Sequence, residues 1–102
     1  MILSKLNWLG VDFDGTLVNT KYPDFTLGEP IHENVEKLKD CVALGYKIVI
    51  HTARPWENHQ MISKYLDDNN IPYDSIVCGK LLVHRYIDDR NIDISKNWAD
   101  QL

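Results

Sequence analysis

The chain has 102 residues, of which 44% are hydrophobic and 25% charged, and its formal net charge at pH 7 is -4. This length suits one domain and is too short for two independent cores, so we expect a single domain over residues 1–102. The composition excludes a disordered chain, and the acidic balance provides no basic patch that would attract nucleic acid or an anionic membrane.

Cysteine usage and the N-terminal sequence bear on the cellular setting. Cys41 and Cys78 stand far apart and form no CxxC pattern. They therefore indicate neither a zinc site nor a disulfide framework, and we expect a reducing, cytoplasmic location. Polar residues interrupt the apolar residues near the N-terminus, so we expect no signal peptide and no membrane span.

The first predicted strand, residues 8–11, is a short apolar run that leads directly into the acidic turn Asp12-Phe13-Asp14-Gly15-Thr16. Residues 19–30 contain two prolines and a glycine among polar and aromatic residues. This mixture predicts an ordered loop, or flap, without regular structure of its own.

Helices and strands alternate in the rest of the chain. Apolar residues at helical spacing, followed by Gly45, predict an amphipathic helix over residues 31–44. The later predicted elements are a strand at 46–51, a helix at 57–69, a short strand at 75–78, a fourth strand that reaches Arg85-Tyr86-Ile87 and ends in Asp88-Asp89-Arg90, and a tail that docks Trp98 on the core.

This alternation predicts βαβ units, and hence an α/β fold with a mostly parallel sheet and right-handed crossovers. Ligands of open α/β sheets bind at the carboxyl ends of the strands. The polar residues that fall at this edge are Asp12, Asp14, Thr52, Lys80, Asp88 and Asp89. Because the four carboxylates repel one another, a hard divalent cation with oxygen ligands, most simply Mg²⁺, is expected among them.

The order of these motifs resembles that of the haloacid dehalogenase (HAD) superfamily of phosphatases. The resemblance spans nearly the whole chain and rests on Asp12-Phe13-Asp14-Gly15-Thr16, a strand that ends at Thr52, Lys80, and Asp88-Asp89. It implies a three-layer, Rossmann-like (HAD-like) parallel sheet flanked by helices. The intervals between the motifs leave no room for a cap domain, and the flanking sequences also look like small bacterial and phage HAD-like hydrolases.

The resemblance implies a Mg²⁺-dependent phosphomonoester hydrolase that acts through an aspartyl-phosphate intermediate. Asp12 would be the nucleophile, and Asp14 the acid and base that distinguishes a phosphatase from a dehalogenase. Thr52 would donate a hydrogen bond to a phosphoryl oxygen, and Lys80 would neutralise its charge. The implied metal site comprises Asp12, Asp14, Asp88 and Asp89, with Asp89 acting through water or by holding Lys80. The residues expected beside the substrate are Gly15, which permits a sharp turn, Thr16, which holds that turn by bonding to backbone, Ala53 and Arg54.

Several residues have two readings. Lys47 or Lys64 could take the place of Lys80. Arg54 and Arg90 either contact a substrate anion or pair with nearby acids to fix the loops. Trp56 either packs on the protein or borders the substrate. The four histidines have no ligand spacing, which favours surface or core-edge positions for His32, His51, His59 and His84.

Two other functions remain as alternatives: a phosphoacceptor module similar to a receiver domain, and a catalytically idle HAD-fold binding domain. The leading DxDGT and closing DD argue against the first, and the intact residue set argues against the second. An open site suits a bulky phosphorylated substrate, whereas a homo-oligomer could enclose the site around a small one. We expect the flap to contact the substrate through Lys21, Tyr22 and Phe25.

Overall fold

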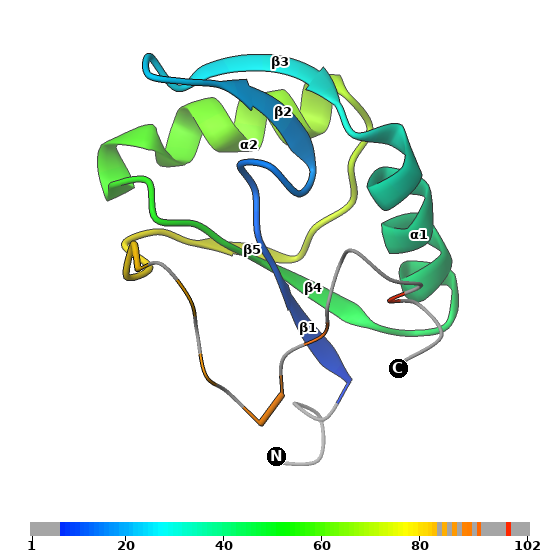
Figure 1. Cartoon of the computed structure of the whole chain (residues 1–102). Helices are drawn as coiled ribbons and strands as arrows, with labels where there is room; N and C mark the ends of the chain where they lie inside the picture. Colours follow the sequence, from blue (N-terminus) through cyan, green and yellow to red (C-terminus); the bar gives the residue numbers. More distant parts are fainter. Residues whose placement is uncertain are drawn as a thin grey trace.

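The computed structural model of the protein describes residues 7–83, 85, 87, 89, 90, 92 and 98. Its helices pack against a parallel sheet, and a hairpin lies across one of the helices (Figure 1). The elements in chain order are β1 (Trp8–Val11), β2 (Val18–Lys21), β3 (Thr26–Pro30), α1 (His32–Ala43), β4 (Lys47–His51), the 3-10 helix η2 (Trp56–Asn58), α2 (His59–Asp68) and β5 (Ser75–Val77).

The sheet has the strand order β1-β4-β5, and both of its strand pairs are parallel. Val11, at the end of β1, lies opposite Ile50, and His51, at the end of β4, lies opposite Val77. The carboxyl ends of the three strands therefore meet at one edge. The predicted α/β fold with a parallel sheet and helices is confirmed.

One hydrophobic core joins the helices to the sheet. Ile48 and Ile50 project from the same face of β4, because side chains alternate along a strand, and both are fully buried. The residues that pack with them include Val35 and Leu38 of α1, Ile62 and Leu66 of α2, Ile76 of β5, and Phe13 and Leu17 from the turn after β1. The helices predicted at 31–44 and 57–69 thus bury most of their apolar stripes, although Val42 and Met61 are exposed and the second helix begins with a 3-10 turn.

Helix α1 ends where Gly45 predicts its cap. Gly45 has a φ of 100°, a left-handed conformation that glycine adopts readily. Its N–H donates to the carbonyl of Val42 at 3.0 Å, and the N–H of Tyr46 donates to that of Cys41 at 3.1 Å. These two bonds form a Schellman motif, which satisfies the last carbonyls of the helix and directs the chain into β4.

The prediction that residues 19–30 lack regular structure is wrong. They belong largely to an antiparallel hairpin in which Thr20 of β2 lies opposite Leu27 of β3. Glycine and proline, which usually indicate loops, have other roles here. A Cβ atom on Gly28 would lie 2.6 Å from the Asn19 carbonyl oxygen, so glycine permits close strand pairing, and Pro30 occupies the last position of β3.

Tyr65 of α2 contacts both this hairpin and the acidic turn after β1. The Tyr65 hydroxyl donates a hydrogen bond of 2.8 Å to the carbonyl of Gly28. The ring of Tyr65 also packs edge-on against that of Phe13, with 5.6 Å between centroids. Tyr65 therefore links the hairpin and the acidic turn to the same helix.

The fourth strand is not seen in the residues that the structure describes. Residues 81–83, 85 and 87 belong to no strand. Tyr86, which was expected at the centre of that strand, and Asp88, expected at its end, lie outside the described residues.

Trp98 is buried, as predicted, and it reaches the acidic turn through one intermediary. Its indole N–H donates to the Asn34 side-chain oxygen at 3.2 Å, and the amide nitrogen of Asn34 donates to the carbonyl of Thr16 at 2.8 Å. Residues far apart in the sequence thus support the same turn.

The thiols of Cys41 and Cys78 are free and buried, and burial raises the pKa of both. A raised pKa keeps a thiol protonated and therefore poorly reactive. In the part of the chain that the structure describes, no helix combines the length and the apolar character needed to cross a bilayer.

Replacing Gly28 with alanine is expected to lower the free energy of unfolding by about 1–3 kcal/mol, because the added methyl would force β2 and β3 apart. Gly10→Ala in β1 is the matched control, since no atom lies within 4 Å of the Cβ it would add. Urea denaturation of both variants measures the difference. Equal stabilities would contradict the close approach of the two strands.

Candidate active site

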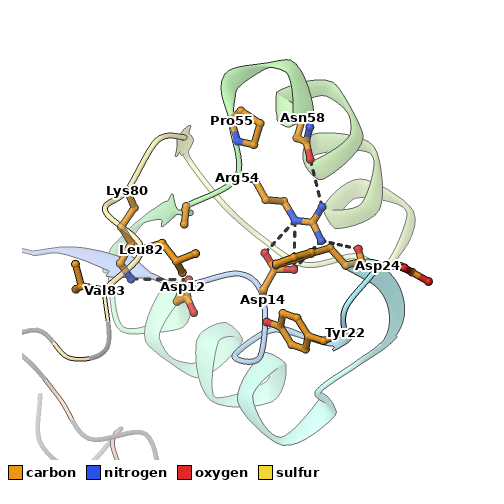
Figure 2. Close-up of a pocket in the computed structure, with 12 residues that line it drawn as sticks. Asp12, Asp14, Tyr22, Asp24, Arg54, Pro55, Asn58, Lys80, Leu82 and Val83 are labelled. Carbon is orange, nitrogen blue, oxygen red and sulfur yellow. Dashed lines mark hydrogen bonds and ion pairs between the residues drawn. The ribbon is translucent and has the colours of Figure 1, made fainter.

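A pocket of about 630 Å³ lies where β1, β4 and β5 end (Figure 2). Its walls come from the turn after β1, the hairpin, the segment after β4 and the segment after β5. The lining residues are Asp12, Asp14, Tyr22, Asp24, Phe25, Ala53, Arg54, Pro55, Asn58, Lys80, Leu82 and Val83. Three of the four residues expected to carry the chemistry, Asp12, Asp14 and Lys80, are thus brought together.

The turn after β1 is held by its own backbone. The carbonyl of Phe13 accepts hydrogen bonds from the N–H groups of Thr16 and Leu17, at 3.2 and 2.9 Å, while the Phe13 ring is fully buried. Gly15 has a φ of 77° and its N–H donates to the carbonyl of Val18, so glycine permits the sharp turn as predicted.

The Asp12 carboxylate lies between a hydroxyl and an ammonium group. Thr16 donates to Asp12 Oδ2 at 3.3 Å, and Lys80 Nζ lies 3.8 Å from Oδ1. Thr16 thus bonds to this carboxylate, where a bond to backbone was expected. Burial raises the pKa of Asp12, whereas the charge of Lys80 and the hydrogen bonds from the Phe13 amide and Thr16 act in the opposite direction.

Of the three candidate lysines, Lys80 is the one that lines the pocket. The main-chain N–H of Lys80 donates to the carbonyl of Thr52 at 2.9 Å, which fixes the backbone beside the end of β4. Lys47 lies opposite Trp8 at the other end of the strands, and Lys64 bonds to Asp68 on the exposed surface of α2.

Arg54 holds the second carboxylate, Asp14, in a bidentate ion pair. Arg54 Nε donates to Asp14 Oδ2 at 2.9 Å and Arg54 Nη2 to Oδ1 at 2.8 Å. The two side chains are only 10% and 16% exposed. Thr20 also donates to Asp14 Oδ1, at 2.6 Å. Of the two readings of Arg54, the structure therefore favours pairing with an acid.

The guanidinium of Arg54 also contacts two other parts of the site. Nη2 donates to the Phe25 carbonyl at 2.9 Å, Nη1 donates to the Asn58 side chain at 3.2 Å, and the guanidinium lies 5.8 Å from the centre of the Phe25 ring. The guanidinium of Arg54 therefore bonds to Asp14, to the hairpin and to η2 at the same time.

Thr52 is fully buried and is not part of the pocket wall, although its neighbours Ala53 and Arg54 are. Its hydroxyl oxygen accepts a hydrogen bond from the Arg54 N–H at 3.1 Å, which leaves the hydroxyl proton able to donate elsewhere. Contact between Thr52 and a phosphoryl oxygen stays a prediction.

The structure does not bring Asp89 into the pocket wall. Asp89 is 89% exposed and lies 3.9 Å from Arg90, a contact too exposed to choose between the two interpretations of this arginine. Asp88 lies outside the described residues, and the metal role of both acids stays a prediction.

The oxygen donors at the pocket provide part of what a Mg²⁺ site requires. Among the described residues no group of three or more His, Cys, Asp or Glu side chains could hold a metal, so none of the histidines described belongs to such a group. The Asp12 carboxylate and main-chain oxygen from its turn are the hard donors that Mg²⁺ prefers. These residues fit part of a Mg²⁺ site, and Asp88 is the expected additional ligand.

Sequence reasoning missed several residues of the site. Thr20 bonds to Asp14, and the alternation of side chains along β2 could have indicated it. Asn58 bonds to Arg54, and its spacing of four residues from Arg54 could have indicated it. Nothing in the sequence indicated that Asp24 lines the pocket, except its position between Tyr22 and Phe25. The remaining lining residues that were not anticipated are Pro55, Leu82 and Val83. Trp56 lies outside the pocket wall and stacks on His59 with 5.9 Å between ring centroids, so it packs on the protein.

Comparisons with known proteins agree with the motif order. A family model described as haloacid dehalogenase-like hydrolase matches residues 9–100. The chain is also similar to a crystal structure of a target protein from Vibrio cholerae, with 31% sequence identity and a TM-score of 0.75, over 91% of this chain and 87% of that one. No curated protein matches the chain at a significant level.

Removing the Arg54 guanidinium should leave Asp14 without its partner and detach the tip of the hairpin. We expect Arg54→Met to lower the free energy of unfolding by about 3 kcal/mol, because it breaks a largely buried ion pair. Hydrogen exchange at residues 22–26 should accelerate at the same time. Arg85→Met, at an exposed position, is the control and should change neither quantity. Unchanged exchange in Arg54→Met would contradict the link to the hairpin.

The raised pKa of Asp12 predicts a pH-dependent stability in metal-free buffer. A carboxyl whose folded pKa exceeds its unfolded value of 3.8 stabilises the fold when protonated, and this contribution is lost as the pH rises through the folded pKa. Asp12→Asn should therefore exceed the wild type in stability at neutral pH, by less than about 1 kcal/mol because the carboxylate is partly exposed. Thermal melts with a chelator should show the difference vanishing below the unfolded pKa. A variant less stable than the wild type at neutral pH would contradict this.

Proposed function

Because the chain belongs to the haloacid dehalogenase-like hydrolases, we propose that it is a phosphatase that hydrolyses phosphomonoesters with Mg²⁺ through an aspartyl-phosphate on Asp12. The main support is the position of Asp12 in the pocket, between Thr16 and Lys80, with a second carboxylate, Asp14, two residues further along the chain. This is the arrangement of nucleophile, cation and acid that covalent phosphoryl transfer requires.

In the first step, a carboxylate oxygen of Asp12 attacks phosphorus while the ester P–O bond breaks. The leaving oxygen takes a proton from Asp14 and departs as an alcohol, so Asp14 must enter this step as the neutral acid although Arg54 favours its carboxylate form. Arg54 and Thr20 keep the Asp14 carboxyl group at the pocket, which limits the positions that the leaving oxygen can occupy.

In the second step, a water molecule attacks phosphorus and gives its proton to Asp14 as the bond between phosphorus and Asp12 breaks. This releases inorganic phosphate and restores both carboxyl groups to their initial states. Lys80 and Thr52 would stabilise the phosphoryl oxygens during both steps. Mg²⁺ held by Asp12, the Asp14 main-chain carbonyl and Asp88 would offset the negative charge at the site.

The match to a hydrolase family supports this function over a receiver-like phosphoacceptor. The intervals between the motif residues support an open site. A hairpin and α1 fill the interval from the turn to β4, and η2, α2 and β5 fill the interval from Thr52 to Lys80. A phosphorylated substrate and a cytoplasmic location are parts of the proposal, and a homo-oligomer that encloses the site around a small substrate is the alternative to an open site with a bulky one.

The proposal predicts that the protein hydrolyses phenyl phosphate when Mg²⁺ is present and stops when a chelator removes the metal. Asp12→Asn should lower kcat/KM at least about 1,000-fold, since the amide cannot form the covalent intermediate. Asp67→Asn, an exposed site on α2, is the control and should keep full activity. Phosphate release can be measured directly. Turnover that survives Asp12→Asn, or no turnover by the wild type, would contradict the proposal.

A further inference from the structure

The pocket has two sides with different chemistry (Figure 2). Asp12 and Lys80 lie on one side, and Asp14 lies on the other with Tyr22 and Asp24 of the hairpin. If Asp14 protonates the leaving group, as the proposed function requires, the alcohol part of the substrate lies on the hairpin side. What this side presents should then decide which alcohols fit.

The tip of the hairpin, residues 22–25, directly borders the Asp14 carboxylate. The same nitrogen, Arg54 Nη2, donates to Asp14 Oδ1 at 2.8 Å and to the Phe25 carbonyl at 2.9 Å. Only one guanidinium group therefore separates the acid from the hairpin tip. An alcohol leaving from beside Asp14 would lie near this tip as well as near Thr20 of β2, which donates to Asp14 Oδ1 at 2.6 Å.

Two aromatic rings of the tip remain exposed at the pocket. Tyr22 is 62% and Phe25 44% exposed, and their rings pack edge to face with 4.8 Å between centroids. Phe25 has a φ of 56°, which is uncommon for a large side chain, and two contacts with Arg54 hold it there. Aromatic surface kept exposed in a fixed orientation suits stacking against a planar ligand.

While Asp14 is ionised and paired with Arg54, Asp24 gives this side a net negative charge. The positive charge of Arg54 is already paired with Asp14, whereas Asp24 lines the pocket and has no ion-pair partner among the residues that the structure describes. A carboxylate in this position attracts no anion, and a second negative charge on the alcohol would be repelled.

We infer that the hairpin tip is a leaving-group subsite that favours phosphomonoesters of alcohols bearing a planar, uncharged ring, and that Asp24 disfavours alcohols with an additional negative charge. Phe25 and Asp24 are the specificity-determining residues of this subsite. The inference rests on the proposed function, because that function places the leaving group beside Asp14.

Two esters of similar size and similar alkoxide basicity test the role of the ring: benzyl phosphate and cyclohexylmethyl phosphate. The wild type should favour the benzyl ester about fivefold in kcat/KM. Phe25→Leu keeps an apolar side chain but removes the planar face, so it should abolish the preference, measured as the ratio of the two kcat/KM values. Trp56→Leu, an exposed aromatic residue outside the pocket wall, is the matched control and should preserve the preference.

A benzyl phosphate that carries a carboxylate on its ring tests the role of the charge. The wild type should hydrolyse it about tenfold less efficiently than benzyl phosphate. Asp24→Asn should restore most of this loss, measured as the ratio of kcat/KM for the charged and the uncharged ester, whereas Asp67→Asn should leave that ratio unchanged.

The outcomes separate the inference from the function beneath it. Hydrolysis without a preference, or a preference that survives Phe25→Leu, would overturn the inference and leave the phosphatase intact. If no ester is hydrolysed, the proposed function fails, and calorimetry then tests the subsite with two phosphonates that cannot be hydrolysed. Phenethylphosphonate should bind about fivefold more tightly than cyclohexylethylphosphonate, and equal dissociation constants would overturn the inference.

Discussion

The ion pair between Arg54 and Asp14 connects the parts of the candidate active site. Asp14 belongs to the turn after β1, and Arg54 follows β4. The remaining donors of Arg54 bond to Phe25 in the hairpin and Asn58 in η2. A guanidinium that is largely buried must satisfy its donors within the protein, since burying an unpaired charge is costly. The same cation therefore positions the acid, the hairpin tip and the start of the second helix.

Much of the scaffold follows from patterns that are local in sequence. Alternating helical and strand periodicities predict the parallel sheet, and the Gly45 cap predicts the end of α1. The meeting of Asp12 and Lys80 is also predictable, because parallel strands bring their carboxyl ends to one edge of the sheet. Residues 68 positions apart in the sequence become neighbours in this way without any specific pairing signal.

Such patterns do not predict contacts that depend on how close two segments or side chains come in space. Gly28 reads as a loop residue until the Asn19 carbonyl is seen packed against it, so the hairpin was missed. From the sequence, Arg54 could equally bind a substrate anion or pair with a nearby acid. The acid with which it pairs, Asp14, is 40 residues away in the sequence. A short-range partner is no easier to predict: the Thr16 hydroxyl bonds to the Asp12 carboxylate, where a bond from this hydroxyl to the backbone was expected.

The central claim is that Asp12 carries the phosphoryl group during turnover. The most direct measurement is mass spectrometry of the peptide that contains Asp12, after acid quenching of the protein while it hydrolyses a phosphomonoester with Mg²⁺. The account predicts one phosphoryl group on Asp12, gained during turnover and lost once the substrate is exhausted. A phosphoryl group on any other residue, or an unmodified Asp12 throughout rapid turnover in which breakdown of the intermediate is rate-limiting, would contradict it.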